Sequence, residues 1–230
     1  MRTFRDRRDA GRKLAQHLDV YRGSSDIIVL ALPRGGVPIG YEIATRLDAP
    51  LDVLVVRKLG VPGHDELAMG AIASGGIRLV DQHIVATLGI SREAFEAVET
   101  RERAELERRD RAFRAGRPPL EVANKIAFLV DDGLATGASM AAAVDALRTR
   151  NPARIIAAVP VAPPATCQAL RKRADDMICL VTPGHMYAVG AWYENFTQTT
   201  DAEVRGLLDA ASRELPARLH AAAGAAPAQR

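Results

Sequence analysis

Five apolar runs of strand length constrain the fold of this chain more than any other feature. They are IIVLAL (27–32), LDVLVV (51–56), KIAFLV (125–130), ARIIAAVPVA (153–162) and DMICLVTP (176–183). Continuous apolar runs, unlike runs that alternate with polar residues, are typical of parallel strands covered by helices on both faces. Segments with helical spacing follow the first, third and fourth runs. This alternation predicts an α/β fold with one parallel sheet and right-handed crossover connections.

Composition excludes several broad classes of protein. The chain has 230 residues, of which 48% are hydrophobic and 26% charged, so it can form a core without disulfides or metals. No uncharged apolar run of 18 residues is present, which argues against a membrane span. The net charge of +3 does not indicate a nucleic-acid partner. The charged N-terminal segment is not followed by an apolar stretch, so we expect a cytoplasmic protein.

An insertion between the second and third runs interrupts the alternation. Residues 69–80 contain two short Gly-punctuated segments that we expect to pair as strands. Residues 91–115 predict one long helix, capped by Ser91 and ended by Gly116. Basic and acidic residues are nearly balanced along it, which is typical of a solvated helix that docks on its own domain or on a second subunit. A role of its arginines in binding nucleic acid is the weaker alternative.

We expect a single domain over residues 1–230. Its core covers about 24–183, a small hood and C-terminal helix cover about 184–213, and a disordered low-complexity tail covers about 220–230. The hood contains the one aromatic cluster of the chain, which comprises Tyr187, Trp192, Tyr193 and Phe196.

Residues 128–140, FLVDDGLATGASM, carry the clearest chemical signal. Two acids follow a buried strand, then a loop of small residues leads into a helix. Such a loop can present backbone N–H groups and hydroxyls to a phosphate, and the positive end of the helix adds to the attraction. Asp131 and Asp132 would repel that phosphate, but they suit sugar hydroxyls or Mg²⁺. The segment therefore predicts a site for a phosphorylated sugar at the carboxyl edge of the sheet.

The same segment resembles a family motif. Residues 128–140 are similar to the phosphoribosyl pyrophosphate (PRPP) motif of type I phosphoribosyltransferases, and LPRGG (32–36) resembles the family's pyrophosphate loop. Residues 57–72 lie where the family has its mobile catalytic loop. The resemblance covers about residues 24–183 and is strongest to small bacterial phosphoribosyltransferase-like proteins. It implies the type I fold, a parallel sheet with helices on both faces, with a flexible β-ribbon loop, a long inserted helix and a small C-terminal hood.

The resemblance assigns each motif to a part of PRPP. Asp131 and Asp132 would hold the ribose hydroxyls. The 5′-phosphate would bind to Ala135, Thr136, Gly137, Ala138 and Ser139. Pyrophosphate would bind to Arg34, Gly35, Gly36, Arg57 and Lys58, with Arg34 as a bidentate fork. The family often has a cis peptide in this pyrophosphate loop, which we expect near Pro33.

The implied reaction separates pyrophosphate from the sugar and leaves an oxocarbenium-like centre. Arg34, Lys58 and Mg²⁺ would stabilise the departing negative charge, and Asp131 and Asp132 complete the catalytic set. Mg²⁺ is the expected cofactor. It would be held mainly by the substrate, with Asp131 and Asp132 as the ligands that the protein could add. Closure of the 59–76 loop would exclude water.

The acceptor is less well defined by the residues. Purine enzymes place an acid or a hydroxyl residue two positions before the glycine of the phosphate loop, where this chain has Ala135. His64, Asp65 or Glu66 could replace it. Trp192 or Tyr193 could stack on a base, although these aromatics could equally pack the C-terminal helix onto the sheet. Members of the family that the chain resembles commonly form homodimers, and the 91–115 helix offers a contact face, but the sequence does not determine the oligomeric state.

Three functions fit these observations. The first is an active phosphoribosyltransferase, with PRPP and an unidentified base as substrates. The second is a regulator or sensor that binds PRPP or a nucleotide without turnover, for which Ala135 and the Arg-rich helix argue slightly. The third is an unrelated phosphosugar enzyme such as a hydrolase. Affinity for PRPP separates the third from the others, and release of pyrophosphate separates the first from the second.

Overall fold

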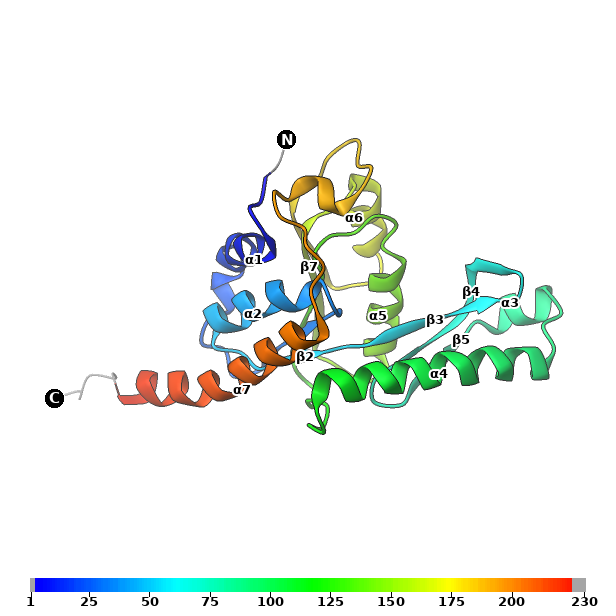
Figure 1. Cartoon of the computed structure of the whole chain (residues 1–230), viewed down its shortest axis with the longest axis horizontal. Coiled ribbons are helices and arrows are strands. Elements are labelled where there is room, and N and C mark those ends of the chain that lie inside the picture. Colours follow the sequence, from blue (N-terminus) through cyan, green and yellow to red (C-terminus); the bar gives the residue numbers. More distant parts are fainter. Residues whose placement is uncertain (1–2, 225–230) are drawn as a thin grey trace.

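A five-stranded parallel sheet forms the centre of the computed structural model (Figure 1), which describes residues 3–224 except for the side chains of 65–66 and 216–224. The strand order is β2-β1-β6-β7-β8. The bounds are Leu51–Val53 for β2, Ile27–Ala31 for β1, Ile126–Val130 for β6, Arg154–Val161 for β7 and Asp176–Val181 for β8. Every pair of neighbours is parallel, which confirms the five predicted strands and the fold class.

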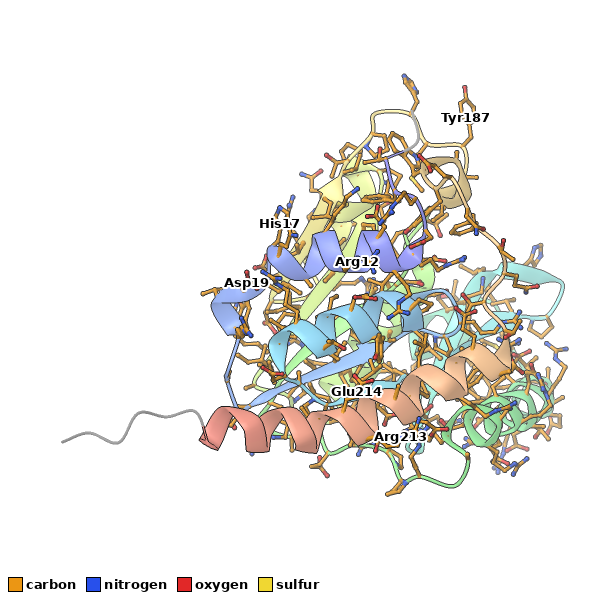
Figure 2. All side chains as sticks on the ribbon, turned by 60° about the vertical axis from the view of Figure 1, so that its left-hand side comes forward. Arg12, His17, Asp19, Tyr187, Arg213 and Glu214 are labelled. Atoms are coloured by element: carbon orange, nitrogen blue, oxygen red, sulfur yellow. The ribbon has the colours of Figure 1, made fainter. Side chains whose placement is uncertain are left out.

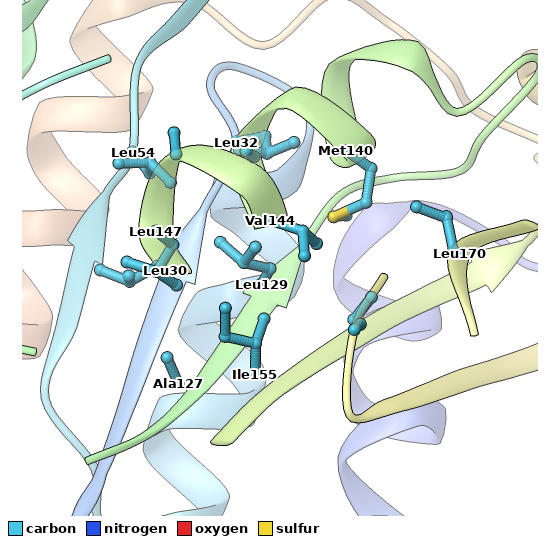
Figure 3. Packing of buried hydrophobic residues seen from close by; sticks show 14 of the residues in the cluster. Leu30, Leu32, Leu54, Ala127, Leu129, Met140, Val144, Leu147, Ile155 and Leu170 are labelled. Atoms are coloured by element: carbon cyan, nitrogen blue, oxygen red, sulfur yellow. The ribbon is translucent and has the colours of Figure 1, made fainter. Parts of the chain in front are cut away.

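Helices cover both faces of this sheet. Helices α5 (Ala138–Arg148) and α6 (Pro164–Leu170) pack on one face, and α1 (Arg7–Gln16) and α2 (Gly36–Leu47) pack on the other. Figure 3 shows α5 lying across its face with Val144 beside Leu129 of β6. Both faces of the central strands are therefore buried, which explains the continuous apolar runs. Each fully buried leucine or isoleucine side chain stabilises the fold by about 1.5–3 kcal/mol.

The insertion between β2 and β6 forms an arm that extends from the sheet (Figure 1). It consists of a three-stranded antiparallel ribbon and two helices. The elements are β3 (Val56–Val61), β4 (His64–Ala73), β5 (Ile77–Val80), α3 (Gln82–Thr87) and α4 (Arg92–Arg114). The hydroxyl of Ser91 accepts a hydrogen bond from the N–H of Ala94, and the helix ends at Ala115 in the left-handed region. The predicted long helix and the paired strands are thus confirmed.

Two boundaries differ from the prediction. The run 51–56 is divided, because the N–H of Val55 donates to the hydroxyl of Ser74 and the chain then pairs with β4. Helix α7 (Asp201–Gly224) continues beyond the predicted end near residue 213, since the alanine-rich sequence favours helix. Residues 220–224, which were predicted to begin a disordered tail, therefore belong to this helix, and residues 225–230 lie outside the described residues. Within the described part of the chain, no helix combines the length and apolarity needed to cross a membrane.

The hood combines the segment before α1 with the residues that follow β8. The short helix η2 (Val189–Trp192) follows a loop after β8, and Tyr187 stands exposed at the tip of that loop (Figure 2). Phe4, from the segment before α1, pairs with Tyr193 in a parallel β-bridge. The hood is therefore built partly from the N-terminal segment, whereas the sequence predicted a purely C-terminal one.

A second short helix, η1 (Asp19–Tyr21), follows α1.

Candidate functional site

The sheet topology brings the two predicted loops together. Residues 32–36 follow β1 and residues 131–137 follow β6, and these two strands are parallel neighbours in which Ala31 aligns with Val130. The N–H of Leu32 donates to the carbonyl of Val130 over 2.8 Å. The helices that follow, α2 and α5, pack on opposite faces of the sheet. This is a topological switch point, where open α/β sheets bind their ligands.

Two glycines let these loops touch. A Cβ atom on Gly35 would lie 2.0 Å from Oδ2 of Asp132, and one on Gly36 would lie 2.4 Å from the carbonyl oxygen of Val130. Any larger residue would therefore push the loop away from the acids. The peptide bond between Pro33 and Arg34 is cis, in the neighbourhood where the resemblance placed one. Loop 32–36 thus lies directly against the acid pair.

The acid pair, Asp131 and Asp132, lies at the end of β6 with both side chains partly buried. The N–H of Asp132 donates to Oδ1 of Asp131 over 2.8 Å. Burial raises the pKa of both carboxyl groups, and the charge of Asp132 raises the pKa of Asp131 further. The guanidinium of Arg7 opposes this effect, because its Nε lies 2.7 Å from Oδ2 of Asp132. Such a pair can accept hydrogen bonds from two hydroxyls or bind a cation.

The loop before α5 is shaped by Gly137. Its φ of +75° favours glycine, and a Cβ atom there would lie 2.7 Å from Cγ2 of Thr166. The hydroxyl of Thr166 donates to the carbonyl of Ala135 over 2.7 Å and holds the loop from outside. The residues on the solvent side are small and lie at the start of the helix. They are Ala135, Thr136, Ala138 and Ser139. The loop therefore presents small residues and the amino end of α5, as an anion site requires.

The predicted pyrophosphate residues are distributed between loop and arm. Nη1 of Arg34 lies 3.3 Å from Oδ1 of Asp201, at the start of α7, and both side chains are partly exposed. Arg57 on β3 donates through Nε to Oε2 of Glu102 on α4 over 2.8 Å. Its guanidinium thus contacts α4 in this structure, and its role toward pyrophosphate stays a prediction. Lys58 follows it along β3, so its side chain leaves the opposite face of the ribbon.

Tyr193 has a structural place in the hood. Its side chain is 2% exposed, and its ring lies 5.4 Å from that of Phe4 and 5.0 Å from that of Phe196. Its hydroxyl donates to the backbone carbonyl of Asp132 over 2.6 Å, and burial raises the pKa of the phenol. The ring is therefore covered by protein, which argues against stacking on a base. Trp192 packs half-buried against the same cluster, and its role stays a prediction.

Sequence reasoning missed Arg7 of α1. Several arginines surround it in the chain, and none of them carries a motif. Only the tertiary fold places its guanidinium on Asp132 and shows that the N-terminal helix borders the acid pair.

Asp65 and Glu66 are two of the candidates to supply the acid or hydroxyl group that Ala135 lacks. Their side chains lie outside the described part of the structure.

At the candidate site, the two carboxylates of the acid pair are the donors that could hold a metal. No group of three or more histidine, cysteine or acidic side chains that could hold a metal occurs among the residues whose side chains are described. Two adjacent carboxylates fit a magnesium ion that takes its remaining ligands from substrate oxygens and water.

Comparison with known proteins points to one family. The model of the phosphoribosyl transferase domain matches residues 5–191. A Mycobacterium tuberculosis H37Rv protein named "Putative phosphoribosyl transferase Rv0571c" is 46% identical over 214 residues, which cover 93% of this chain and 48% of that protein. A protein of strain CDC 1551, MT0597, matches equally. The chain thus spans about half the length of these curated relatives.

One solved structure is similar over nearly its whole length. TT1426 from Thermus thermophilus is 40% identical, with a TM-score of 0.82. The match covers 90% of this chain and 98% of TT1426. The two proteins therefore share the same overall fold.

Proposed function

Because this chain belongs to the phosphoribosyl transferase domain family, we propose that it transfers the phosphoribosyl group of PRPP to a nitrogen acceptor with release of pyrophosphate. The observation that carries the proposal is the direct contact between the two predicted motifs. A Cβ atom on Gly35 would meet the Asp132 carboxylate at 2.0 Å, so the loop and the acids form one continuous surface. A substrate with pyrophosphate next to a ribose fits such a surface.

Each part of PRPP then has a place. The ribose hydroxyls donate to Asp131 and Asp132, and the 5′-phosphate accepts hydrogen bonds from residues 135–139 at the start of α5. Pyrophosphate lies on Gly35 and Gly36 with the Arg34 guanidinium beside it. To reach it, Arg34 exchanges its contact with Asp201, an exposed ion pair worth at most about 1 kcal/mol.

The chemistry requires stabilisation of charge more than covalent participation. As the bond to pyrophosphate breaks, negative charge develops on the leaving group and positive charge on the sugar. Arg34 and Lys58 stabilise the former, and Arg57 adds to it if the arm closes and releases Glu102. Asp131 and Asp132 orient the ribose. Mg²⁺, held by substrate oxygens and the acid pair, would neutralise part of the pyrophosphate charge.

A second candidate function is a sensor that binds PRPP or a nucleotide without turnover. It is favoured by Ala135, which provides no acid or hydroxyl at the position where the purine enzymes carry one. In both cases we propose a cytoplasmic protein. A homodimer is part of the same proposal, with α4 as the contact face.

Release of pyrophosphate tests the proposal. Purified protein is incubated with PRPP, Mg²⁺ and a panel of purine, pyrimidine and simple amine acceptors, and pyrophosphate is measured. One acceptor is expected to give release that depends on Mg²⁺. Binding of PRPP with no release from any acceptor would support the sensor instead. Absence of PRPP binding would contradict the transferase and the PRPP sensor, and would leave a nucleotide sensor as the remaining candidate.

Two variants connect the activity with the site. Asp132→Asn and Arg34→Ala are each expected to weaken PRPP binding about 10- to 100-fold, the usual effect of losing a hydrogen bond to a charged group. Two control variants remove charges of the same sign at other exposed places. Asp145→Asn removes the carboxylate on α5 that pairs with Arg173, and Arg171→Ala removes an arginine at the end of α6. These controls should bind PRPP normally. Normal binding by both site variants would contradict the site assignment.

A further inference from the structure

Thr166 on α6 contacts the loop that precedes α5. Its hydroxyl donates to the carbonyl of Ala135 over 2.7 Å, and the residue is 9% exposed. Its methyl group fills the space beside Gly137, since a Cβ atom added there would lie 2.7 Å from Cγ2 of Thr166. Both branches of this side chain therefore contact the candidate phosphate loop, residues 135–139, although Thr166 belongs to none of the recognised motifs.

The start of α6 gives Thr166 a fixed position. Pro163 precedes the helix and Pro164 is its first residue, and proline restricts the backbone at both positions. A threonine hydroxyl in a helix commonly bonds to a carbonyl one turn earlier on the same helix. The hydroxyl of Thr166 donates instead to Ala135, 31 residues away in the chain. The hydrogen bond therefore acts on the phosphate loop rather than within α6.

This hydrogen bond fixes the direction of one peptide unit. The C=O and the N–H of a trans peptide point to opposite sides, so the carbonyl of Ala135, held on α6, turns the N–H of Thr136 away from α6. Within the described part of the chain, the N–H groups of Thr136 and Gly137 have no protein acceptor. Unpaired N–H groups beside the amino end of a helix attract an anion.

We infer that Thr166 is a positioning residue of the 5′-phosphate site, whose hydroxyl keeps the peptide between Ala135 and Thr136 turned so that its N–H faces the phosphate. This inference rests on the proposed function. Without the hydroxyl the peptide can rotate, and a carbonyl oxygen turned toward the phosphate would repel it. Affinity for the phosphate therefore depends on α6, an element outside the recognised motifs.

The alternative is a purely structural role, in which Thr166 only packs α6 against the loop. The two roles differ in the part of PRPP that they affect. Ribose 5-phosphate carries the phosphate that would bind at residues 135–139, whereas inorganic pyrophosphate would bind at residues 32–36. A general loss of structure would weaken the binding of both ligands, but a misdirected peptide would weaken that of ribose 5-phosphate alone.

Three variants separate these roles. Thr166→Val replaces the hydroxyl by a methyl group, and Thr166→Ser keeps the hydroxyl but removes the methyl group. Thr149→Val is the matched control, because the hydroxyl of Thr149 donates over 2.7 Å to the carbonyl of Ala146 at the other end of α5. Dissociation constants for ribose 5-phosphate and for pyrophosphate, each with Mg²⁺, are measured by calorimetry, and each variant is also melted thermally.

We expect Thr166→Val to bind ribose 5-phosphate about 3- to 10-fold more weakly, and pyrophosphate with unchanged affinity. Thr166→Ser should keep most of the affinity for ribose 5-phosphate. Thr149→Val should bind both ligands normally, even if it melts at as low a temperature as Thr166→Val. Unchanged binding of ribose 5-phosphate by Thr166→Val, or equal weakening of both ligands, would overturn the inference.

Crystal structures without substrate separate this inference from the proposed function. The carbonyl of Ala135 should point to Thr166 in the wild type and turn away from residue 166 in Thr166→Val. A carbonyl that keeps its direction in Thr166→Val overturns the role of Thr166, even if the wild type binds PRPP. If the wild type binds neither PRPP nor ribose 5-phosphate, the proposed function fails, whatever direction the carbonyl takes.

Discussion

Asp131 shows how the site and the stability of the fold oppose each other. Burial and the neighbouring Asp132 raise the pKa of its carboxyl well above the ordinary value of about 3.9. The folded protein therefore holds this proton more tightly than the unfolded chain does. Between the ordinary and the raised pKa, the free energy of unfolding must decrease as pH increases.

We predict that Asp131→Asn stabilises the protein at pH 8 by about 1 kcal/mol, or about 2–4 °C in melting temperature, because no buried charge has to form. The gain should disappear below about pH 4, where the aspartate is protonated in both states. PRPP binding should decrease in the same variant. Thermal melting at pH 4 and pH 8 measures the effect, and a variant less stable than the wild type at pH 8 would contradict it.

Residues within one motif could be recognised from the sequence, whereas residues that act across the fold could not. Asp131, Asp132 and the small-residue loop follow one another in the chain, so their pattern is visible. Arg7 reaches Asp132 only because α1 packs on the face of the sheet beside the hood. The aromatic character of Tyr193 suggests a role in stacking on a base, but its hydroxyl supports the backbone of Asp132.

The pairing of β1 with β6 makes loop 32–36 depend on the side chain of Asp132. We predict that Gly35→Ala weakens PRPP binding at least about 10-fold, since the new methyl group would overlap the Asp132 carboxylate. Gly206→Ala on α7 is the control, because a Cβ atom there would meet no atom within 4 Å apart from the backbone of its own helix. It should bind PRPP normally and be slightly more stable, as alanine favours helix. Equal PRPP affinities in the two variants would contradict the close contact.

Helix α4 is attached to the sheet through Arg114. Its side chain is 5% exposed, and it donates to the carboxylates of Asp52 and Asp110 and to the carbonyl of Val53. The balanced charges of 91–115 predicted a solvated helix, and several of its ion pairs are indeed exposed. The charge pattern did not distinguish this one arginine, because its burial depends on the chain leaving β2 next to it.

We predict that Arg114→Ala lowers the free energy of unfolding by about 3–5 kcal/mol, because it leaves the Asp52 charge buried and unpaired. Arg109→Ala on the same helix removes an exposed pair with Glu105 and should cost less than about 1 kcal/mol. Urea denaturation compares the two variants. Similar losses for both would show that the Arg114 cluster is not buried in solution.

The whole molecule divides into a sheet that is buried on both faces and an arm that extends from it. We predict that hydrogen exchange is slowest in β1, β6 and β7 and fastest at the β3–β4 turn. If the arm closes over the substrate, PRPP with Mg²⁺ should slow exchange within 57–72. Mass spectrometry of the exchanged peptides measures both effects. Unchanged exchange in 57–72 when PRPP is saturating would contradict closure.

At the scale of the whole molecule, the sequence predicted the sheet but not the contacts between distant segments of the chain. The five apolar runs indicated the sheet, because a strand that is buried on both faces is apolar at successive positions. The contribution of the segment before α1 to the hood was not predicted, since the pairing of Phe4 with Tyr193 depends on contacts between distant segments.

The order of the strands has a consequence for the synthesis of the protein. Loop 32–36 and the acid pair belong to neighbouring strands, yet the entire arm is synthesised between them. A chain still emerging from the ribosome can complete α2 and the arm, but it cannot form the site until β6 has inserted beside β1. Pairing between such distant segments is slow. The phosphate-binding surface is therefore expected to appear late, and an incomplete chain should expose the open edge of β1 to other chains until then.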